Sequence, residues 1–221
     1  MKLYYLTGAQ FALANLAMRR VKISRFSELN DPFELMAMDL SDDEDRRAVE
    51  GFRDEMNASK GVICFSSTWE NPVLWGHYAD KHRGVALGFE VNDDLLVEAT
   101  YENCRFHLPR DPVTNRVKPD EETVRRILST KFTDWQYENE WRFFVELSEA
   151  TLESGLYFEE FSESLKLTEV ILGAKCELPK EKVQALIDAM KLHAKVIKAR
   201  IAHDEFKVIE DNSALLPPPA L

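Results

Sequence analysis

The stretch Trp135-Gln136-Tyr137-Glu138-Asn139-Glu140-Trp141-Arg142-Phe143-Phe144-Val145 decides the fold prediction. With a period of two residues, the apolar side chains from Trp141 onward point to one side, and Glu138, Glu140 and Arg142 point to the other. This alternation predicts a strand with one apolar face. Two interpretations of the polar face stay open: an ordinary solvated surface, because antiparallel sheets commonly face water on one side, or the floor of a polar cleft.

The composition is that of a soluble globular protein. The chain has 221 residues, 45% of them hydrophobic and 30% charged, with a net charge of -11 and a pI near 5.0. We expect a single domain over residues 1–212 and a flexible proline-rich tail over residues 213–221. The acidic charge argues against a surface that neutralises a nucleic-acid backbone.

Cysteine usage and hydropathy indicate the compartment. The three cysteines are odd in number and form no CxxC pair, so neither a disulfide framework nor a cysteine–zinc site is predicted. The first 20 residues lack a signal-peptide pattern, and no apolar run approaches the roughly 20 residues that span a bilayer. We therefore expect a cytoplasmic protein with no membrane partner.

Working outward from the opening stretch, strands and helices are expected in mixed order. Strands are predicted over residues 2–6, 21–26, 61–66, 85–91, 157–161 and 167–172, and helices over residues 9–19, 41–59, 72–84, 119–130 and 179–195. The helix at 9–19 reads as largely buried, and the loop at 107–119 as a candidate mobile flap. The fold class is therefore predicted as α+β, with a mixed, split central sheet flanked by helices.

A constrained turn is expected at residues 29–34, which we call the elbow. Pro32 fixes its own φ angle and keeps Asp31 out of the helical region, while Asn30 and Asp31 can bond nearby backbone amides. The chemistry allows two interpretations. The elbow is either an Asx-type turn that ends a strand, or a rigid turn that holds side chains in a site.

The predicted helix at 72–84 carries aromatic and histidine side chains. Trp75, Tyr78 or Ala79, and His82 are expected on a shared face, and His77 and Lys81 on another. They form either a binding wall or a set of structural side chains. The two histidines are five residues apart, which is not the spacing of a helical metal pair, so no metal site is predicted.

Three ordered motifs together resemble the bacterial family catalogued as domain of unknown function 2971. They are the elbow, the pair formed by residues 64–66 and 74–84, and residues 135–142. The resemblance covers roughly residues 2–175. It implies a bacterial protein but no established activity.

The order of elements is also similar to the ADP-ribosyltransferase architecture, whose members bind NAD in a cleft between two sheets. This resemblance implies site residues by position. Tyr4 or Tyr5 would take the first-strand position, Ser24 and Arg25 the second-strand turn, Tyr78 the aromatic wall, and Glu138 or Glu140 the place of the catalytic glutamate. The chain departs from the pattern because it has no first-strand histidine.

Two hypotheses follow for function. In the first, the protein is an enzyme that cleaves NAD as its substrate, with Glu138 or Glu140 stabilising an oxocarbenium-like transition state and Arg25, Arg142 or Lys131 holding the pyrophosphate. In the second, it is a non-catalytic nucleotide- or protein-binding module of a bacterial defence system, such as phage defence, or of a toxin–antitoxin system. Its acceptor or physiological partner stays open.

A metal-dependent nuclease is a third, less favoured class, with Asp31, Glu34, Glu138 and Glu140 as its carboxylates. It is less favoured because no metal-ligand spacing is present and the acidic charge does not favour nucleic acid. All three require one shared hollow lined by the elbow, the tryptophan-rich helix and the acidic strand. Its candidate binding residues are Tyr4, Ser24, Arg25, Asn30, Asp31, Trp75, His77, Tyr78, His82, Lys131 and Arg142.

Overall fold

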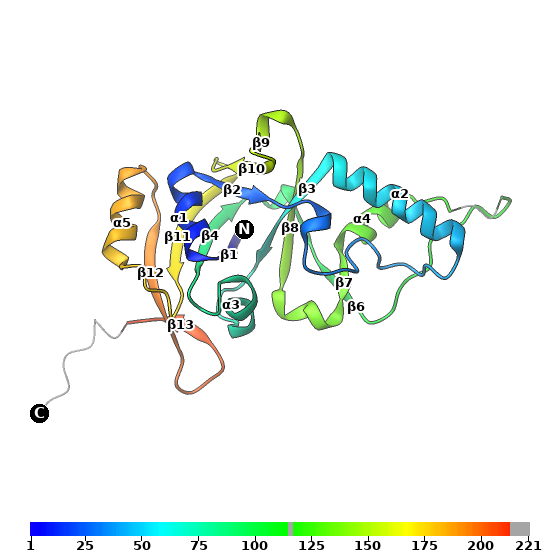
Figure 1. Cartoon of the computed structure of the whole chain (residues 1–221). Helices are drawn as coiled ribbons and strands as arrows, with labels where there is room; N and C mark the ends of the chain where they lie inside the picture. Colours follow the sequence, from blue (N-terminus) through cyan, green and yellow to red (C-terminus); the bar gives the residue numbers. More distant parts are fainter. Residues whose placement is uncertain (115–116, 213–221) are drawn as a thin grey trace, which may run out of the picture. The chain divides into compact units, whose positions relative to one another are not determined.

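The computed structural model describes residues 1–114 and 117–212 (Figure 1). The predicted tail at 213–221 and part of the predicted loop at 107–119 lie outside the described residues. The chain divides into two compact units. Unit 1 contains residues 1–20, 65–93 and those from 160 onward, and unit 2 contains residues 21–64 and 94–159. The expected single domain stays a prediction.

Unit 1 contains five neighbouring strands of an eight-stranded mixed sheet, in the order β13-β12-β11-β4-β1. The bounds are β1 (Lys2–Thr7), β4 (Val85–Val91), β11 (Leu165–Leu172), β12 (Lys195–Ile201) and β13 (Val208–Glu210). Strand β4 lies between two antiparallel partners, β1 and β11. The only parallel pair in these bounds, β11 with β12, is joined through α5 (Lys180–Ala189), as a parallel connection requires.

Helix α3 (Pro72–Tyr78) packs its apolar side on this sheet. Trp75 and Ala79 form one buried cluster with Ala86 of β4, Ile171 of β11 and Ile197 of β12. The indole nitrogen of Trp75 donates to the carbonyl of Trp69 over 2.5 Å, so the polar atom of this buried ring is satisfied.

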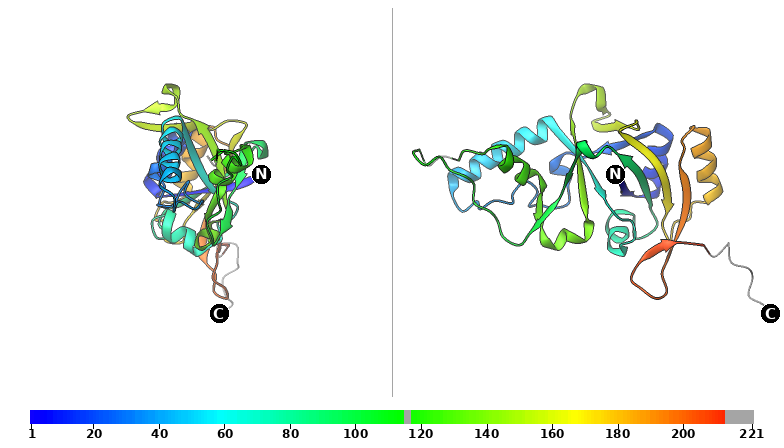
Figure 2. Two further views of the ribbon diagram at one scale, coloured as in Figure 1. Left: turned by 90° about the vertical axis from the view of Figure 1, so that its right-hand side faces the viewer. Right: turned by 180° about the vertical axis from the view of Figure 1, so that it is seen from behind.

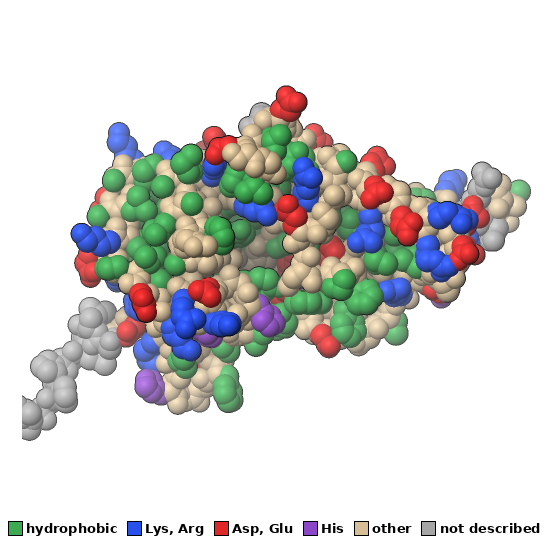
Figure 3. Space-filling model, in the orientation of Figure 1, with side chains coloured by type: hydrophobic (Ala, Val, Ile, Leu, Met, Phe, Trp, Pro, Cys, Tyr) green, Lys and Arg blue, Asp and Glu red, His purple; other side chains and the backbone are tan. Residues whose placement is uncertain are grey.

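The first helix is α1 (Ala9–Met18), and it is less buried than predicted. Only Ala12, Asn15 and Leu16 are buried, whereas Phe11 and Met18 are exposed. Apolar side chains gather on the visible surface in the region of α1 and α5 (Figure 3). The prediction of a largely buried helix is wrong, because apolar residues occupy all sides of α1 and only one side can face the sheet.

The helix predicted over residues 72–84 ends at Tyr78, before its expected stop at Gly84. Asp80, Lys81 and His82 follow with φ angles of 43°, 55° and 70°. Left-handed backbone costs roughly 1–2 kcal/mol for each non-glycine residue. The turn is held by contacts distant in sequence, including the Lys175 amide, which donates to the His82 carbonyl over 2.9 Å.

Unit 2 combines strands with two helices (Figure 2). Its strand orders are β3-β8-β5, β2-β10-β9 and β6-β7. The bounds are β2 (Arg20–Ile23), β3 (Lys60–Ser66), β5 (Leu96–Glu98), β6 (Thr100–Glu102), β7 (Thr130–Phe132), β8 (Glu140–Glu146), β9 (Leu152–Glu153) and β10 (Leu156–Glu160). Short 3-10 helices lie at η1 (Phe26–Glu28), η2 (Asp93–Leu95), η3 (Thr133–Glu138) and η4 (Glu149–Thr151).

The helices of unit 2 are α2 (Asp43–Ser59) and α4 (Glu121–Ser129). Asp42 caps α2 by accepting from the Glu44 and Asp45 amides, and acidic residues fill its first turn. Val49 of α2 and Ile127 of α4 join one buried cluster with Leu35. The α+β fold class is thus confirmed. No described helix is long and apolar enough to cross a membrane.

We expect Gly173→Ala to destabilise unit 1. A Cβ atom there would lie 2.4 Å from the His82 carbonyl oxygen and 2.9 Å from a ring carbon of Trp75, so the left-handed turn would have to shift. Overpacking of this kind costs about 1–3 kcal/mol in the free energy of unfolding, which urea titration measures. The matched control is Gly51→Ala in α2, where a Cβ meets nothing within 4 Å. There the higher helix propensity of alanine should raise the free energy of unfolding by about 0.5–1 kcal/mol. Equal effects of the two changes would contradict the prediction.

Candidate functional site

Strand β8 begins at Glu140, later than the opening stretch predicted. Glu138 ends η3, and Asn139 reverses the chain with a φ of 44° before the strand starts. The predicted common face of Glu140 and Arg142 is present, but it is neither solvated nor an open floor. Glu140 is 3% exposed and Arg142 is 0% exposed.

The guanidinium of Arg142 uses all its donors. Nη1 and Nη2 donate to the two carboxylate oxygens of Glu34 over 2.5 and 3.1 Å. Nε and Nη2 donate to Glu140 over 3.2 and 3.3 Å, and Nη1 also donates to the Leu128 carbonyl over 2.7 Å. A guanidinium carries five N–H groups, and these five hydrogen bonds match them. The neighbouring carboxylates raise the pKa of Arg142 against the effect of its burial.

Lys131 on β7 completes the arrangement. Its ammonium contacts Glu138 and lies 3.0 Å from Glu140, and it sits 5.1 Å from the centre of the Trp135 ring. Burial would lower the pKa of Lys131, but Glu140 and Glu138 raise it. Glu34, Lys131, Glu138, Glu140 and Arg142 are all buried and form what we call the charge network.

The electrostatics fix the ionisation of Glu140. Burial alone would raise its pKa, but Arg142 and then Lys131 outweigh that effect and hold the pKa at about 2. Burial raises the pKa of the nearby Cys64 thiol, and the charge of Glu140 adds to the increase. Tyr101 is neutral at physiological pH, with a pKa raised by burial to about 12, and its hydroxyl accepts from the Glu140 amide over 2.8 Å.

The Asx-type interpretation of the elbow describes its first part, and a role in a functional site stays a prediction. The Asp31 carboxylate accepts from the Phe33 amide over 2.9 Å, which is the Asx-type turn. The side chains of Phe33 and Glu34 have opposite environments. Glu34 is buried against Arg142, whereas Phe33 is 54% exposed. Leu35 adopts a left-handed φ of 61°. The elbow is therefore a turn that also delivers one side chain to the charge network.

The other predicted residues of unit 2 lie elsewhere. Ser24 forms an isolated bridge with Val62. The guanidinium of Arg25 lies over the Tyr157 ring at 5.0 Å and donates to its hydroxyl over 3.3 Å. Asn30 is exposed. Within unit 2, the structure thus brings together Lys131, Glu138, Glu140 and Arg142, but not Ser24 or Arg25.

The remaining predicted residues belong to unit 1. Trp75 is buried and stacks on His82, with ring centres 6.3 Å apart. The Nδ1 atom of His82 is buried and has no hydrogen-bond partner among residues 1–114 and 117–212, and burial lowers the pKa of this histidine. The rings of His77 and Tyr78 meet edge to face at 6.1 Å.

Tyr4 lies on the sheet of unit 1 beside an acidic side chain. Burial and then the charge of Glu169 raise the pKa of Tyr4, and Lys2 pairs with the same carboxylate over 2.6 Å. The hollow expected between these residues and the charge network stays a prediction.

A pocket of about 290 Å³ adjoins the charge network in unit 2. It shares Lys131 with the network and has the two half-exposed rings of Phe33 (54%) and Phe132 (45%) in its lining. The Arg105 guanidinium lies 5.3 Å from the centre of the Phe33 ring. The lining of this aromatic pocket is Phe33, Met36, Ala37, Glu102, Asn103, Cys104, Arg105, Thr130, Lys131 and Phe132.

The sequence analysis did not predict the aromatic pocket, although Phe33 and Phe132 are each next in sequence to a residue of the predicted site. Phe33 precedes Glu34 in the elbow, and Phe132 follows Lys131 on β7. Because neighbours on a strand face opposite sides, a buried Lys131 predicts an outward Phe132. That signal becomes visible only once the burial of Lys131 is known.

One protein family matches part of the chain. The family described as "Protein of unknown function (DUF2971)" matches residues 74–143. The matched stretch includes Trp75 and His82 of unit 1 and Lys131, Glu140 and Arg142 of unit 2. It supports the predicted resemblance over this part of the chain. The chain has no significant match among curated proteins or solved structures.

We expect Arg142→Met to destabilise unit 2 strongly, because it leaves Glu34 and Glu140 buried without their main counter-charge. Breaking a buried pair in this way costs about 3–5 kcal/mol in the free energy of unfolding. The matched control is Arg47→Met on the exposed side of α2, which should change stability by less than about 0.5 kcal/mol. Urea titration of both variants gives the comparison, and similar values for the two would contradict a buried network.

The depressed pKa of Glu140 predicts a loss of stability in acid. Its ionised form favours folding, so this contribution is complete above the ordinary pKa of about 4.5 and disappears as the pH falls towards about 2. Unfolding free energies measured from pH 7 to pH 2 should decline across this window, and Glu140→Gln should remove part of the decline. A Glu140→Gln variant with the same acid profile as the wild type would refute this assignment.

Proposed function

We propose that this protein is a non-catalytic binding module for a nucleotide, and that the aromatic pocket holds the base. The observation that carries the proposal is the pair of half-exposed rings, Phe33 and Phe132, in the lining of one pocket. Large aromatic side chains normally bury most of their area, and rings left accessible in a concave site favour a flat ligand. Stacking of one base on an aromatic side chain is worth about 1–3 kcal/mol.

The rim of the aromatic pocket carries a hydrogen-bond donor beside the rings. Arg105 stacks on Phe33, and its guanidinium makes no hydrogen bond within the described part of the chain. A stacked guanidinium keeps the N–H groups at its edge available for hydrogen bonds to acceptor atoms of the bound base. The volume of about 290 Å³ lies near the lower end for ligand pockets and suits one base better than a whole dinucleotide.

The charge network supports binding by keeping the pocket rigid. Arg142 holds the elbow through Glu34, and Glu138 and Glu140 hold Lys131, which lines the pocket. A site whose walls are fixed before binding loses less conformational entropy when the ligand arrives. The network therefore has a role in binding that requires no contact between its carboxylates and the ligand.

The burial of Glu138 and Glu140 favours this proposal over NAD cleavage. They are 5% and 3% exposed, and both contact Lys131. A carboxylate that stabilises an oxocarbenium ion must lie against the ribose. NAD cleavage would therefore require the charge network to open, and it stays a prediction, as do the ADP-ribosyltransferase-like architecture and a role in bacterial defence.

We expect the wild-type chain to bind AMP and the Phe132→Ala variant to bind it about tenfold more weakly, because the variant loses one stacking face. Isothermal titration calorimetry gives both affinities. The matched control is Phe11→Ala, which removes an exposed ring from α1 in unit 1 and should leave the affinity unchanged. No binding of AMP by the folded wild-type chain, or equal losses in the two variants, would overturn the proposal.

Nicotinamide release decides between binding and catalysis. The proposal predicts none when the wild-type chain is incubated with NAD and the products are separated by chromatography. Release that disappears in a folded Glu140→Gln variant would overturn the non-catalytic assignment and establish the enzyme hypothesis instead.

A further inference from the structure

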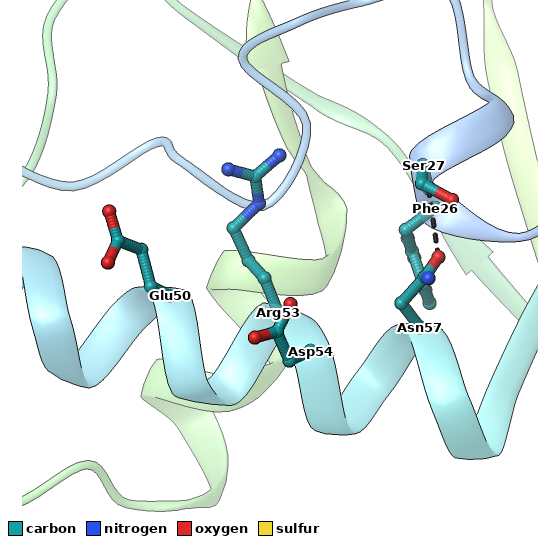
Figure 4. A pocket seen from close by; sticks show the side chains of 6 residues that line it. All are labelled: Phe26, Ser27, Glu50, Arg53, Asp54 and Asn57. Carbon is teal, nitrogen blue, oxygen red and sulfur yellow. Dashed lines mark hydrogen bonds between the residues drawn. The ribbon is translucent and has the colours of Figure 1, made fainter.

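A second pocket of unit 2 lies between α2 and η1. Its volume is about 370 Å³, and its lining is Phe26, Ser27, Glu50, Arg53, Asp54 and Asn57. In Figure 4, Glu50, Arg53 and Asn57 extend from α2 on the side that faces η1. We call this the polar pocket, because five of its six lining side chains carry polar groups.

Arg53 is the cation of the polar pocket, and its donors are largely unused. The side chain is half-buried, and its contact within residues 1–114 and 117–212 is Nη1 donating to the Met36 sulfur over 3.2 Å. A thioether is a weak acceptor and carries no charge. The guanidinium therefore keeps donors available for an oxyanion in a partly desolvated place, where charge-assisted hydrogen bonds are strong.

The other side chains supply both donors and acceptors. The side-chain oxygen of Asn57, Oδ1, accepts from the Ser27 backbone amide over 3.0 Å (Figure 4). The side-chain NH₂ group of Asn57 is therefore left to donate elsewhere. Glu50 and Asp54 form no ion pair within the described part of the chain. Their two carboxylates disfavour a bare anion next to Arg53 but can accept from hydroxyl groups. An oxyanion attached to a hydroxylated carbon chain, which is a sugar phosphate, matches this set.

The polar pocket and the aromatic pocket meet at Met36. Met36 lines the aromatic pocket, and its sulfur contacts Arg53 of the polar pocket. Methionine is flexible and adapts to neighbouring groups, so it makes a compliant partition between the two. We infer that the polar pocket binds the sugar-phosphate part of the nucleotide, with Arg53 as its phosphate ligand. The inference that both pockets bind parts of one nucleotide rests on the proposed base-binding function.

The test compares AMP, adenosine and ribose 5-phosphate by calorimetry on wild-type, Arg53→Gln and Arg53→Lys chains. The wild type should bind AMP at least tenfold more tightly than adenosine, and Arg53→Gln should reduce that ratio towards one without changing the affinity for adenosine. Arg53→Lys keeps the charge and should retain part of the ratio. The matched control is Arg47→Gln, an exposed arginine on the same helix that lines neither pocket.

The outcomes separate this inference from the proposed function. Binding of ribose 5-phosphate that Arg53→Gln abolishes supports the inference, even if adenosine does not bind and the base-binding proposal fails. The inference is overturned if Arg53→Gln changes neither the ratio of AMP affinity to adenosine affinity nor the affinity for ribose 5-phosphate. This holds even if adenosine binds and the base-binding proposal stands. Thermal melting of each variant shows whether the chain is folded.

Discussion

The bidentate pair between Arg142 and Glu34 is the interaction on which unit 2 depends. It joins β8 to the elbow, and the same guanidinium also holds the end of α4 through the Leu128 carbonyl. Desolvating these charges is expensive, and only complete pairing offsets it. The charge network is therefore close to all-or-none, and the elbow position, the Lys131 position and the wall of the aromatic pocket follow from it together.

Patterns in the sequence predicted those helices and strands whose ends depend on residues nearby in the chain. Helix α2 begins where an aspartate cap precedes an acidic turn, and β4 coincides with its apolar run. The end of α3 could not be predicted this way, because the left-handed backbone at Asp80–His82 depends on a partner at Lys175. The exposed face of α1 was also missed, since composition does not say how much of a helix its neighbours cover.

The sequence predicted the residues of the candidate site better than it predicted their burial and their neighbours. Periodicity placed Glu140 and Arg142 on one face correctly, but their burial depends on Glu34, which is 108 residues away from Arg142. Periodicity alone does not distinguish a solvated polar face from one closed by another segment. Arg53 shows the same limit, because a helical pattern cannot show that its neighbour in space is the Met36 sulfur.

The long separation between Glu34 and Arg142 has a consequence for biosynthesis. A ribosome adds roughly 5–20 residues each second, so the acidic partner waits several seconds before its cation emerges. During that interval the elbow has no anchor, and the apolar residues after it are accessible to chaperones. Unit 2 should therefore mature late on the growing chain, after most of its own backbone has left the exit tunnel.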